Sequence, residues 1–147
     1  MASNLFSLDG KVALVTGGSR GIGKMIAEGF LSQGAAKVYI TARKAGPCEA
    51  TATELSAKYI GQCVALPIDI STMAGIDLLA AEIIKHEPKL DILVNNAGAA
   101  WGADFDDFPE SGWDKVMNLN AKTPFFPTKA LAAPLRAAAS AERPAKV

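Results

Sequence analysis

Hydrophobic residues along most of the chain alternate between short continuous runs and helical patterns. The run at residues 11–16 (KVALVT) is apolar and rich in β-branched residues, which predicts a parallel strand buried on both faces. Behind it, Ile22, Ile26 and Phe30 recur every fourth residue, and Gly34 provides a C-terminal stop. The pattern therefore predicts a strand followed by a helix of about three turns.

The same alternation continues further along the chain. Segments 37–41 (KVYIT) and 62–69 (QCVALPID) predict two more strands, and a helix that opens with Pro47 lies between them. Ser71 is placed to cap a third helix, and segment 90–98 (LDILVNNAG) predicts a fourth strand with its turn. Helices between strands are typical of βαβ units, so we expect an α/β fold with one doubly wound parallel sheet, a Rossmann fold.

The pattern changes after Gly98. Residues 99–113 (AAWGADFDDFPESGW) predict a loop with polar and aromatic side chains, and residues 113–120 (WDKVMNLN) predict a short helix. Pro124 suits the first turn of a final helix, but Pro127 removes a backbone hydrogen bond soon after it. We expect that final helix to be irregular.

Composition and charge narrow the range of functions. The 147 residues suffice for one domain with a core, so we treat residues 1–147 as a single domain. The 15 Lys and Arg residues balance the 15 Asp and Glu residues, which argues against nucleic acid or an anionic membrane as a partner. With no bilayer-spanning stretch and no signal-peptide pattern, we expect a cytoplasmic protein. Cys48, Cys63 and His86 lack metal-type spacing, so we expect reduced thiols and no metal site.

Segment 16–23 (TGGSRGIG) is a glycine-rich turn between the first strand and the first helix. In a doubly wound sheet this turn is the privileged place for a ligand. Gly17 can take the tight conformation, Gly21 allows a pyrophosphate to approach the backbone, and Gly23 allows the helix to pack closely. Any tight strand-to-helix turn can require glycine, but the position of this one in the first βαβ unit favours dinucleotide binding.

The end of the second strand discriminates between the two nicotinamide cofactors. NAD-binding proteins of this fold usually place a carboxylate there, on the ribose 2′-hydroxyl. This chain instead has Arg43 and Lys44, and Arg20 in the turn adds another cation. Cations near the adenosine ribose attract a 2′-phosphate, so we expect NADP. The alternative is that Arg43 is an ordinary solvated cation at a strand end.

Three motifs occur in order and at compatible spacing: TGGSRGIG at 16–23, DIS at 69–71 and NNAG at 95–98. Together they resemble the short-chain dehydrogenase/reductase family over nearly the whole chain. Residues 95–120 more narrowly resemble bacterial NADPH-dependent 3-ketoacyl reductases, including those linked to rhamnolipid precursors. The resemblance implies hydride transfer between a nicotinamide and a carbonyl or alcohol carbon of a small-molecule substrate.

The resemblance also implies roles for particular residues. Asp69 would hydrogen-bond the adenine amino group, with Ile70 beside the ring. Asn95 would tie neighbouring strands and, with the rest of NNAG, line the floor of the site. Asn120 matches the family's catalytic asparagine, whose main chain binds a water in a proton relay. The expected cofactor-binding residues are Thr16, Gly17, Ser19, Arg20, Gly21, Ile22, Gly23, Arg43, Asp69, Ile70, Asn95, Ala97 and Gly98.

The family's catalytic tyrosine and lysine, spaced Y-x-x-x-K, have no match in this sequence. Four residues after Tyr39 and Tyr59 stand Arg43 and Cys63, which do not fit. The family's serine follows the fifth strand, and residues 144–147 (PAKV) resemble the first residues of that strand. We therefore expect a C-terminally incomplete domain, truncated before or within its fifth strand.

Two classes of function stay open at this point. The first is the cofactor-binding N-terminal part of an NADP-dependent carbonyl or 3-ketoacyl reductase, a homo-oligomer when complete. The second is a non-catalytic dinucleotide-binding or interaction module, or a truncated gene product, without turnover. Titration with both cofactors tests the first class, since equal or tighter NADH binding contradicts the argument from Arg43.

Overall fold

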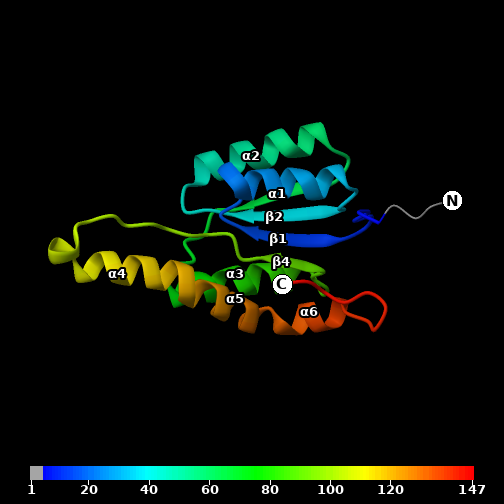
Figure 1. Cartoon of the computed structure of the whole chain (residues 1–147). Helices are drawn as coiled ribbons and strands as arrows, with labels where there is room; N and C mark the ends of the chain where they lie inside the picture. The colour runs from blue at the N-terminus through cyan, green and yellow to red at the C-terminus, as the bar shows by residue number, and fades with distance from the viewer. Residues whose placement is uncertain (1–4) are drawn as a thin grey trace.

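A parallel β-sheet with the strand order β3-β2-β1-β4 forms the centre of the computed structural model, which describes residues 5–147 (Figure 1). Leu14 of β1 lies opposite Tyr39 of β2 on one side and Leu93 of β4 on the other. The chain order reverses between β1 and β4, and ligands of such sheets bind at this reversal, beyond the carboxyl ends of the strands. The strands are β1 (Val12–Thr16), β2 (Lys37–Thr41), β3 (Gln62–Leu66) and β4 (Ile92–Val94).

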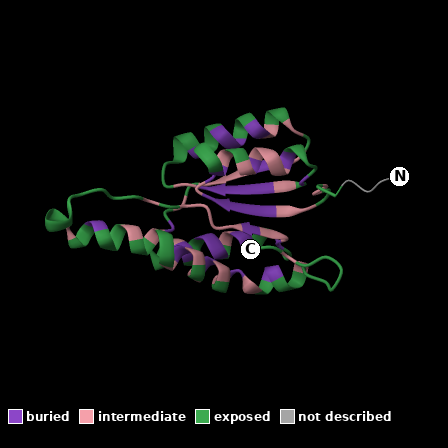
Figure 2. Cartoon of the chain, in the orientation of Figure 1, coloured by how far each residue is buried: buried purple, intermediate pink, exposed green. Residues whose placement is uncertain are grey.

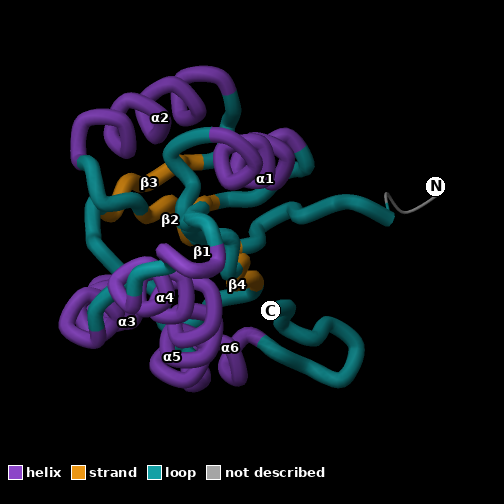
Figure 3. Tube along the Cα trace, turned by 60° about the vertical axis from the view of Figure 1, so that its left-hand side comes forward, coloured by secondary structure: helices purple, strands orange, loops and turns teal. Residues whose placement is uncertain are grey.

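Helices cover both faces of the sheet (Figures 1 and 3). The helices α1 (Gly21–Ser32) and α2 (Ala45–Lys58) lie on one face, and α3 (Met73–His86) lies on the other with α5 and α6. This is the doubly wound Rossmann arrangement that the sequence predicts. The remaining helical segments are η1 (Phe105–Asp107), α4 (Glu110–Met117), the π-helical η2 (Asn118–Lys122), α5 (Thr123–Ala130) and α6 (Ala132–Ala138).

The strand β1 is buried along most of its length (Figure 2), and its side chains divide between two apolar cores, one on each face of the sheet. Ala13 and Val15 belong to the core that α1 and α2 cover, whereas Leu14 belongs to the core on the side of α3. Leu131 and Leu135 join this second core, so the C-terminal helices pack against the sheet through their own apolar residues. Alternate burial on both faces explains why the strand reads as a continuous apolar run.

The third strand and the third helix differ from the predicted bounds. The strand β3 ends earlier than predicted, at Leu66, because Pro67 has no N–H to donate to the sheet. The cap of α3 is Thr72, whose Oγ1 accepts a hydrogen bond from Gly75 N at 3.1 Å. The prediction that Ser71 is the cap is therefore wrong by one position.

Two helices begin earlier than the pattern predicts. The helix α2 starts at Ala45, so that Pro47 lies within its first turn, where a missing N–H costs no helical hydrogen bond. The helix α4 starts at Glu110, directly after Pro109, although the pattern predicts a start at Trp113. In both cases the fixed φ of a proline suits the beginning of a helix.

The C-terminal helical region is irregular, as the sequence predicts. The π-helical turn η2 separates α4 from α5, and the chain breaks again at Leu131, between α5 and α6. Pro127 lies inside α5, where it removes a backbone donor.

Lys146 lies beside the edge strand β4, in a single parallel bridge to Ile92. Its N–H donates to Asp91 O, and its carbonyl accepts from Leu93 N, both at 2.9 Å. Lys146 thus pairs with the outer side of β4, at the end of the sheet order.

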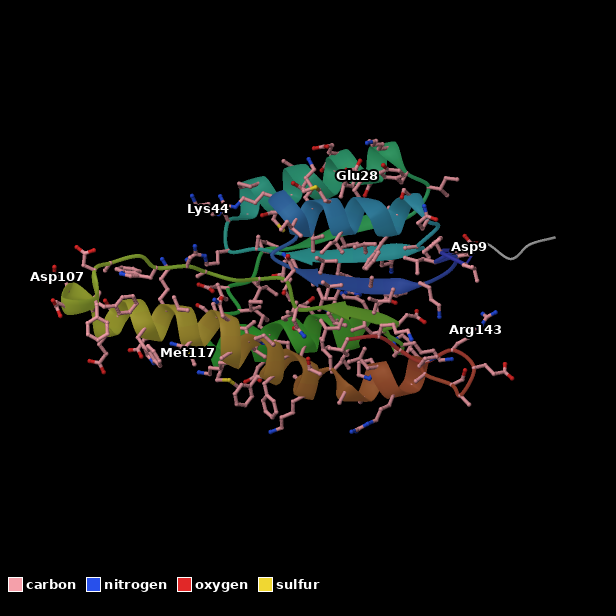
Figure 4. The ribbon with its side chains drawn as sticks, in the orientation of Figure 1. Asp9, Glu28, Lys44, Asp107, Met117 and Arg143 are labelled. Carbon is pink, nitrogen blue, oxygen red and sulfur yellow. The ribbon has the colours of Figure 1, made fainter. Side chains whose placement is uncertain are left out.

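Residues 99–117 extend away from the sheet beyond the carboxyl ends of the strands, and we call them the arm (Figure 1). The arm contains η1 and α4, and Asp107 lies at its far end (Figure 4). All its aromatic side chains are exposed by two fifths or more, from 41% for Trp101 and Phe108 to 95% for Phe105.

Candidate cofactor-binding site

The glycine turn follows β1 directly and enters α1. Gly17 and Gly21 have φ values of +68° and +54°, a region that favours glycine. An added Cβ on Gly17 would lie 3.0 Å from Ala97 Cα. On Gly23 it would collide with the Gly17 carbonyl and lie 2.5 Å from Asn96 Nδ2. Gly17 and Gly23 thus occupy a sharp turn and a close helix approach, as predicted.

The Thr16 side chain joins the glycine turn to the NNAG motif. Its hydroxyl donates to Val94 O at 3.2 Å and accepts from the N–H groups of Asn96 and Ala97, both at 3.0 Å. Asn96 Nδ2 in turn donates to the carbonyls of Thr16 and Gly17, at 2.9 and 3.3 Å. These bonds fix the carboxyl ends of β1 and β4 against each other.

Asn96 is a residue that the sequence analysis missed. The expected set includes Asn95, Ala97 and Gly98 but not Asn96, whose side chain makes the contacts to the turn. The motif itself contained the signal, because either asparagine of NNAG can supply an amide donor.

The N-terminus of α1 offers unoccupied donors to an anion. Among the described residues no side chain caps this helix, and its first turn contains no acidic residue. Gly21 and Ile22 are exposed, and an added Cβ on Gly21 would meet no described atom within 4 Å. Free N–H groups and the positive end of the helix dipole therefore face open space, which suits a pyrophosphate.

Three cations lie near this helix terminus. Gly18 N donates to Thr41 O at 3.2 Å, which places the glycine turn against the end of β2. Arg20 in the turn, and Arg43 and Lys44 after β2, are exposed. Figure 4 shows Lys44 at the end of the sheet where α1 begins. The chemistry of these donors fits a dinucleotide with an additional phosphate on its ribose.

Asp69 and Ile70, the residues expected at the adenine, differ in exposure. Asp69 is exposed, and its Oδ1 accepts from Ser71 N at 3.0 Å. The Ile70 side chain is only 4% exposed and packs in the core next to α3, while its carbonyl accepts from the Thr123 hydroxyl at 3.2 Å. Contact of either residue with adenine stays a prediction.

Asn95 connects β4 to the C-terminal helices. Its Nδ2 donates to Thr128 Oγ1 at 3.1 Å. Its Oδ1 is buried and has no hydrogen-bond partner among residues 5–147. The bond from Nδ2 joins β4 to α5, whereas the predicted role of Asn95 in tying neighbouring strands stays a prediction.

Asn120, the expected catalytic residue, binds the base of the arm. Its Oδ1 accepts from Ala99 N and its Nδ2 donates to Ala99 O, both at 2.8 Å. It lies in the π-helical turn η2, and an added Cβ on Gly98 would be 3.2 Å from Asn120 Oδ1. Such π-turns are frequent at functional sites, and this one brings Asn120 next to the NNAG motif.

A hollow of about 390 Å³ lies between the loop of the arm and α4. Trp101 forms one side: an added Cβ on Gly112 would lie 2.7 Å from its Cδ1, and Lys115 Nζ is 5.0 Å from its ring centroid. The lining is mostly apolar, so the hollow suits a hydrocarbon group. It is formed by Ala99, Ala100, Trp101, Phe108, Trp113, Val116, Met117 and Asn120.

Both tyrosines are engaged away from this site. Tyr39 is 3% exposed and donates to Glu87 Oε1 at 2.7 Å, an oxygen that also accepts from Lys37 Nζ at 2.6 Å. Burial and this carboxylate raise the pKa of Tyr39. Tyr59 donates to Glu28 Oε1 at 2.9 Å, on the outside of α1 and α2. Both tyrosine hydroxyls are therefore engaged with carboxylates away from the glycine turn.

Residues 5–147 contain no cluster of three or more side chains that could hold a metal ion. Cys48 and Cys63 are buried free thiols, and burial raises the pKa of Cys63 to about 12. None of the helices described is both long and apolar enough to cross a membrane.

Comparison with known proteins adds a family to this geometry. The model of the short chain dehydrogenase family matches residues 11–142. The chain is 54% identical over 142 residues to the rhamnolipids biosynthesis 3-oxoacyl-[acyl-carrier-protein] reductase of Pseudomonas aeruginosa, covering 97% of this chain and 54% of that protein. It is 39% identical over 121 residues to an NAD-dependent glycerol dehydrogenase of Listeria innocua, covering 82% and 46%. The chain thus spans about half the length of these relatives.

Solved structures agree with the fold. The Pseudomonas aeruginosa RhlG/NADP active-site complex superposes with a TM-score of 0.90 at 54% identity, over 95% of this chain and 54% of that one. L-sorbose reductase from Gluconobacter frateurii, complexed with NADPH and L-sorbose, gives a TM-score of 0.85 at 30% identity, over 90% and 50%. These similar proteins include complexes with NADP and NADPH as well as an NAD-dependent enzyme.

Proposed function

The chain belongs to the short-chain dehydrogenase family, and on that basis we propose that it is the cofactor-binding part of an NADP-dependent oxidoreductase. One observation carries the choice of NADP. Arg20 and Arg43 are exposed at the end of the sheet where the uncapped α1 begins, and the sequence TARK at the end of β2 contains no carboxylate. A 2′-phosphate suits two guanidinium groups, whereas NAD would lack its usual acidic partner.

The residues of the turn have distinct tasks in this proposal. The N–H groups at Gly21, Ile22 and Gly23 bind the pyrophosphate, and Ser19, Arg20 and Arg43 surround the 2′-phosphate. The remaining expected residues, from Thr16 and Gly17 to the NNAG motif, shape the turn and the floor beneath it. When bound, the cofactor supplies the hydride chemistry.

A 3-oxoacyl compound is the proposed substrate class of the complete enzyme. The apolar hollow between the arm and α4 supports it, because an acyl chain needs an apolar surface. The 54% identity to a protein named as a 3-oxoacyl-[acyl-carrier-protein] reductase supports it as well. Asn120, which borders this hollow, is the proposed catalytic residue of the chain.

A second candidate function is a dinucleotide-binding module without turnover. The observation that favours it is the engagement of Tyr39 and Tyr59 with Glu87 and Glu28, away from the hollow. Under this alternative the chain binds NADPH but does not oxidise it in the presence of a 3-oxoacyl thioester.

Association of copies and a cytoplasmic location complete the proposal. Trp113 and Phe125 are 60% and 63% exposed, and such apolar side chains favour contact with a second copy of the complete protein. Sedimentation of the complete protein tests the association.

Titration of the purified chain with NADPH and NADH tests the proposed cofactor. The reduced nicotinamide is fluorescent, so one instrument follows both ligands under identical conditions. The proposal expects tighter binding of NADPH. A parallel assay for NADPH oxidation then separates the two candidate functions, because only an oxidoreductase that is active in this form consumes NADPH.

A further inference from the structure

We propose that Thr51 of α2 is a positioning residue for recognition of the cofactor's 2′-phosphate. Its hydroxyl donates to the Ser19 carbonyl at 2.8 Å, and the residue is only 6% exposed. This inference rests on the proposed binding of NADP. It adds a residue from a helix that none of the sequence motifs includes.

The contact fixes the peptide group between Ser19 and Arg20. That peptide is trans, as are all those described, so its N–H points away from its carbonyl. Because the carbonyl is directed at Thr51, the Arg20 N–H is directed away from Thr51. Thr51 therefore sets the direction in which the backbone of Arg20 faces a ligand.

The same helix supports the second cation of the proposed site. Arg43 lies two positions before the first residue of α2, Ala45, so α2 follows it almost at once. The turn is already fixed to β2 by the bond from Gly18 N to Thr41 O, and an added Cβ on Gly18 would lie 2.6 Å from Ile40 Cγ2. Loss of the Thr51 bond would therefore change the orientation of the Ser19–Arg20 peptide relative to Arg43 while Gly18 stays fixed to β2.

The ion pairs that join α1 to α2, Lys24–Glu54 and Lys58–Glu28, are weaker contacts than the bond from Thr51 to the turn. Lys24 Nζ donates to both carboxylate oxygens of Glu54, at 2.9 and 2.7 Å. The pair is exposed, and exposed ion pairs contribute little to stability. Thr51 is buried, and its hydroxyl donates the side-chain hydrogen bond that holds the Ser19 carbonyl.

Loss of the Thr51 bond should affect binding of the 2′-phosphate of NADP and not binding of its pyrophosphate. A 2′-phosphate needs donors that converge from the turn and from the end of β2, whereas the pyrophosphate is bound by the start of α1. Loss of the Thr51 contact should therefore weaken ligands that carry a 2′-phosphate and leave ligands without one unchanged.

The test compares Thr51→Val with wild type, using NADPH and 2′,5′-ADP against NADH and 5′-AMP. We expect Thr51→Val to lower the affinity for NADPH and 2′,5′-ADP about fivefold, the size of one lost neutral hydrogen bond, with NADH and AMP changed less than twofold. Thr51→Ser keeps the hydroxyl and should restore wild-type affinity. Thr53→Val, at an exposed position of the same helix, is the matched control for the change in side chain.

Thermal melts establish that each variant is folded. If Thr51→Val does not fold, Thr51→Ala against Thr51→Ser makes the same comparison without the added methyl group. Equal losses for all four ligands, or no loss for any, would overturn the role of Thr51. Failure of the proposed function is a separate outcome, since wild type would then bind NADPH no more tightly than NADH.

Discussion

The glycine turn and the arm lie at the same end of the sheet, yet they are built in opposite ways. Thr16 is fully buried, and its hydroxyl connects three backbone groups of the NNAG region. The arm is fixed at its base by Asn120 and exposes most of its aromatic side chains. The proposed cofactor site is therefore closely packed around the glycine turn, whereas the apolar hollow of the arm is open to solvent.

The largest expected effect comes from closing the space that the turn needs. In Gly23→Ala the new methyl group would collide with the Gly17 carbonyl and with Asn96 Nδ2. We expect loss of binding of both cofactors, together with a stability loss of about 1–3 kcal/mol from overpacking. Titration calorimetry and urea unfolding measure the two effects.

Gly29→Ala in the same helix is the control for this substitution. An added Cβ there meets no described atom within 4 Å, so the variant should be about 0.5–1 kcal/mol more stable. If Gly23→Ala binds NADPH as wild type does, the close approach of α1 to the turn has no part in binding.

The next largest effect concerns the choice between cofactors. Arg43→Glu replaces a proposed phosphate ligand with a carboxylate that can bind the ribose hydroxyls. We expect the ratio of NADPH to NADH affinity to fall about 100-fold, since a favourable charge contact becomes a repulsive one. Arg143→Glu makes the same change in net charge at the far end of the molecule and should leave the ratio unchanged (Figure 4). If the ratio of NADPH to NADH affinity changes equally in Arg43→Glu and Arg143→Glu, the effect comes from net charge and not from contact of Arg43 with the phosphate.

A smaller effect is expected from the hydroxyl that joins the two motifs. Thr16→Val leaves the half-buried N–H groups of Asn96 and Ala97 without their acceptor, at a cost of about 2 kcal/mol in the free energy of unfolding. Thr16→Ser retains the acceptor and should lose less than half as much. Urea unfolding at 25 °C measures the free energy of unfolding of both variants. Similar losses of stability in Thr16→Val and Thr16→Ser would contradict a stabilising role of the Thr16 hydroxyl.

The last prediction needs no substitution, because tryptophans report on the exposed arm and cysteines report on the buried core beside α2. Both tryptophans, Trp101 and Trp113, lie in the exposed arm, and both cysteines, Cys48 and Cys63, are buried in the core next to α2. Because the pKa of Cys63 is raised to about 12, its thiol stays protonated at pH 8. Acrylamide should quench the fluorescence of Trp101 and Trp113 readily, because both rings are exposed. A thiol reagent should label neither Cys48 nor Cys63 in the folded chain, because both are buried. Labelling of the folded chain at the rate of the unfolded one would contradict the difference between the regions.

Sequence patterns predicted those parts of the molecule that local physics determines. The continuous apolar run that contains Val12–Thr16 can only be a buried strand here, and Gly17 and Gly23 are required by the turn geometry. Helix starts were less predictable, because a proline in the first turn can take several positions, as Pro47 does.

Contacts between distant segments could not be predicted from the pattern. The motif NNAG contains two asparagines, and the sequence prediction included Asn95 only. The packing of β4 against β1 shows that the Asn96 amide is the one that contacts the turn. Thr51 lies outside every sequence motif. It contacts Ser19 only because α2 packs beside the glycine turn. The sequence therefore predicts the residues that contact a ligand better than the residues that position them.

The measurement that tests the central claim most directly is the titration of this chain with NADPH and NADH in one buffer at one ionic strength. If Arg20 and Arg43 face the ribose as proposed, with no carboxylate in TARK at the end of β2, NADPH should bind at least tenfold more tightly, about 1.4 kcal/mol in binding free energy. Equal affinity, or tighter binding of NADH, would contradict the claim that this turn and its cations recognise a 2′-phosphate.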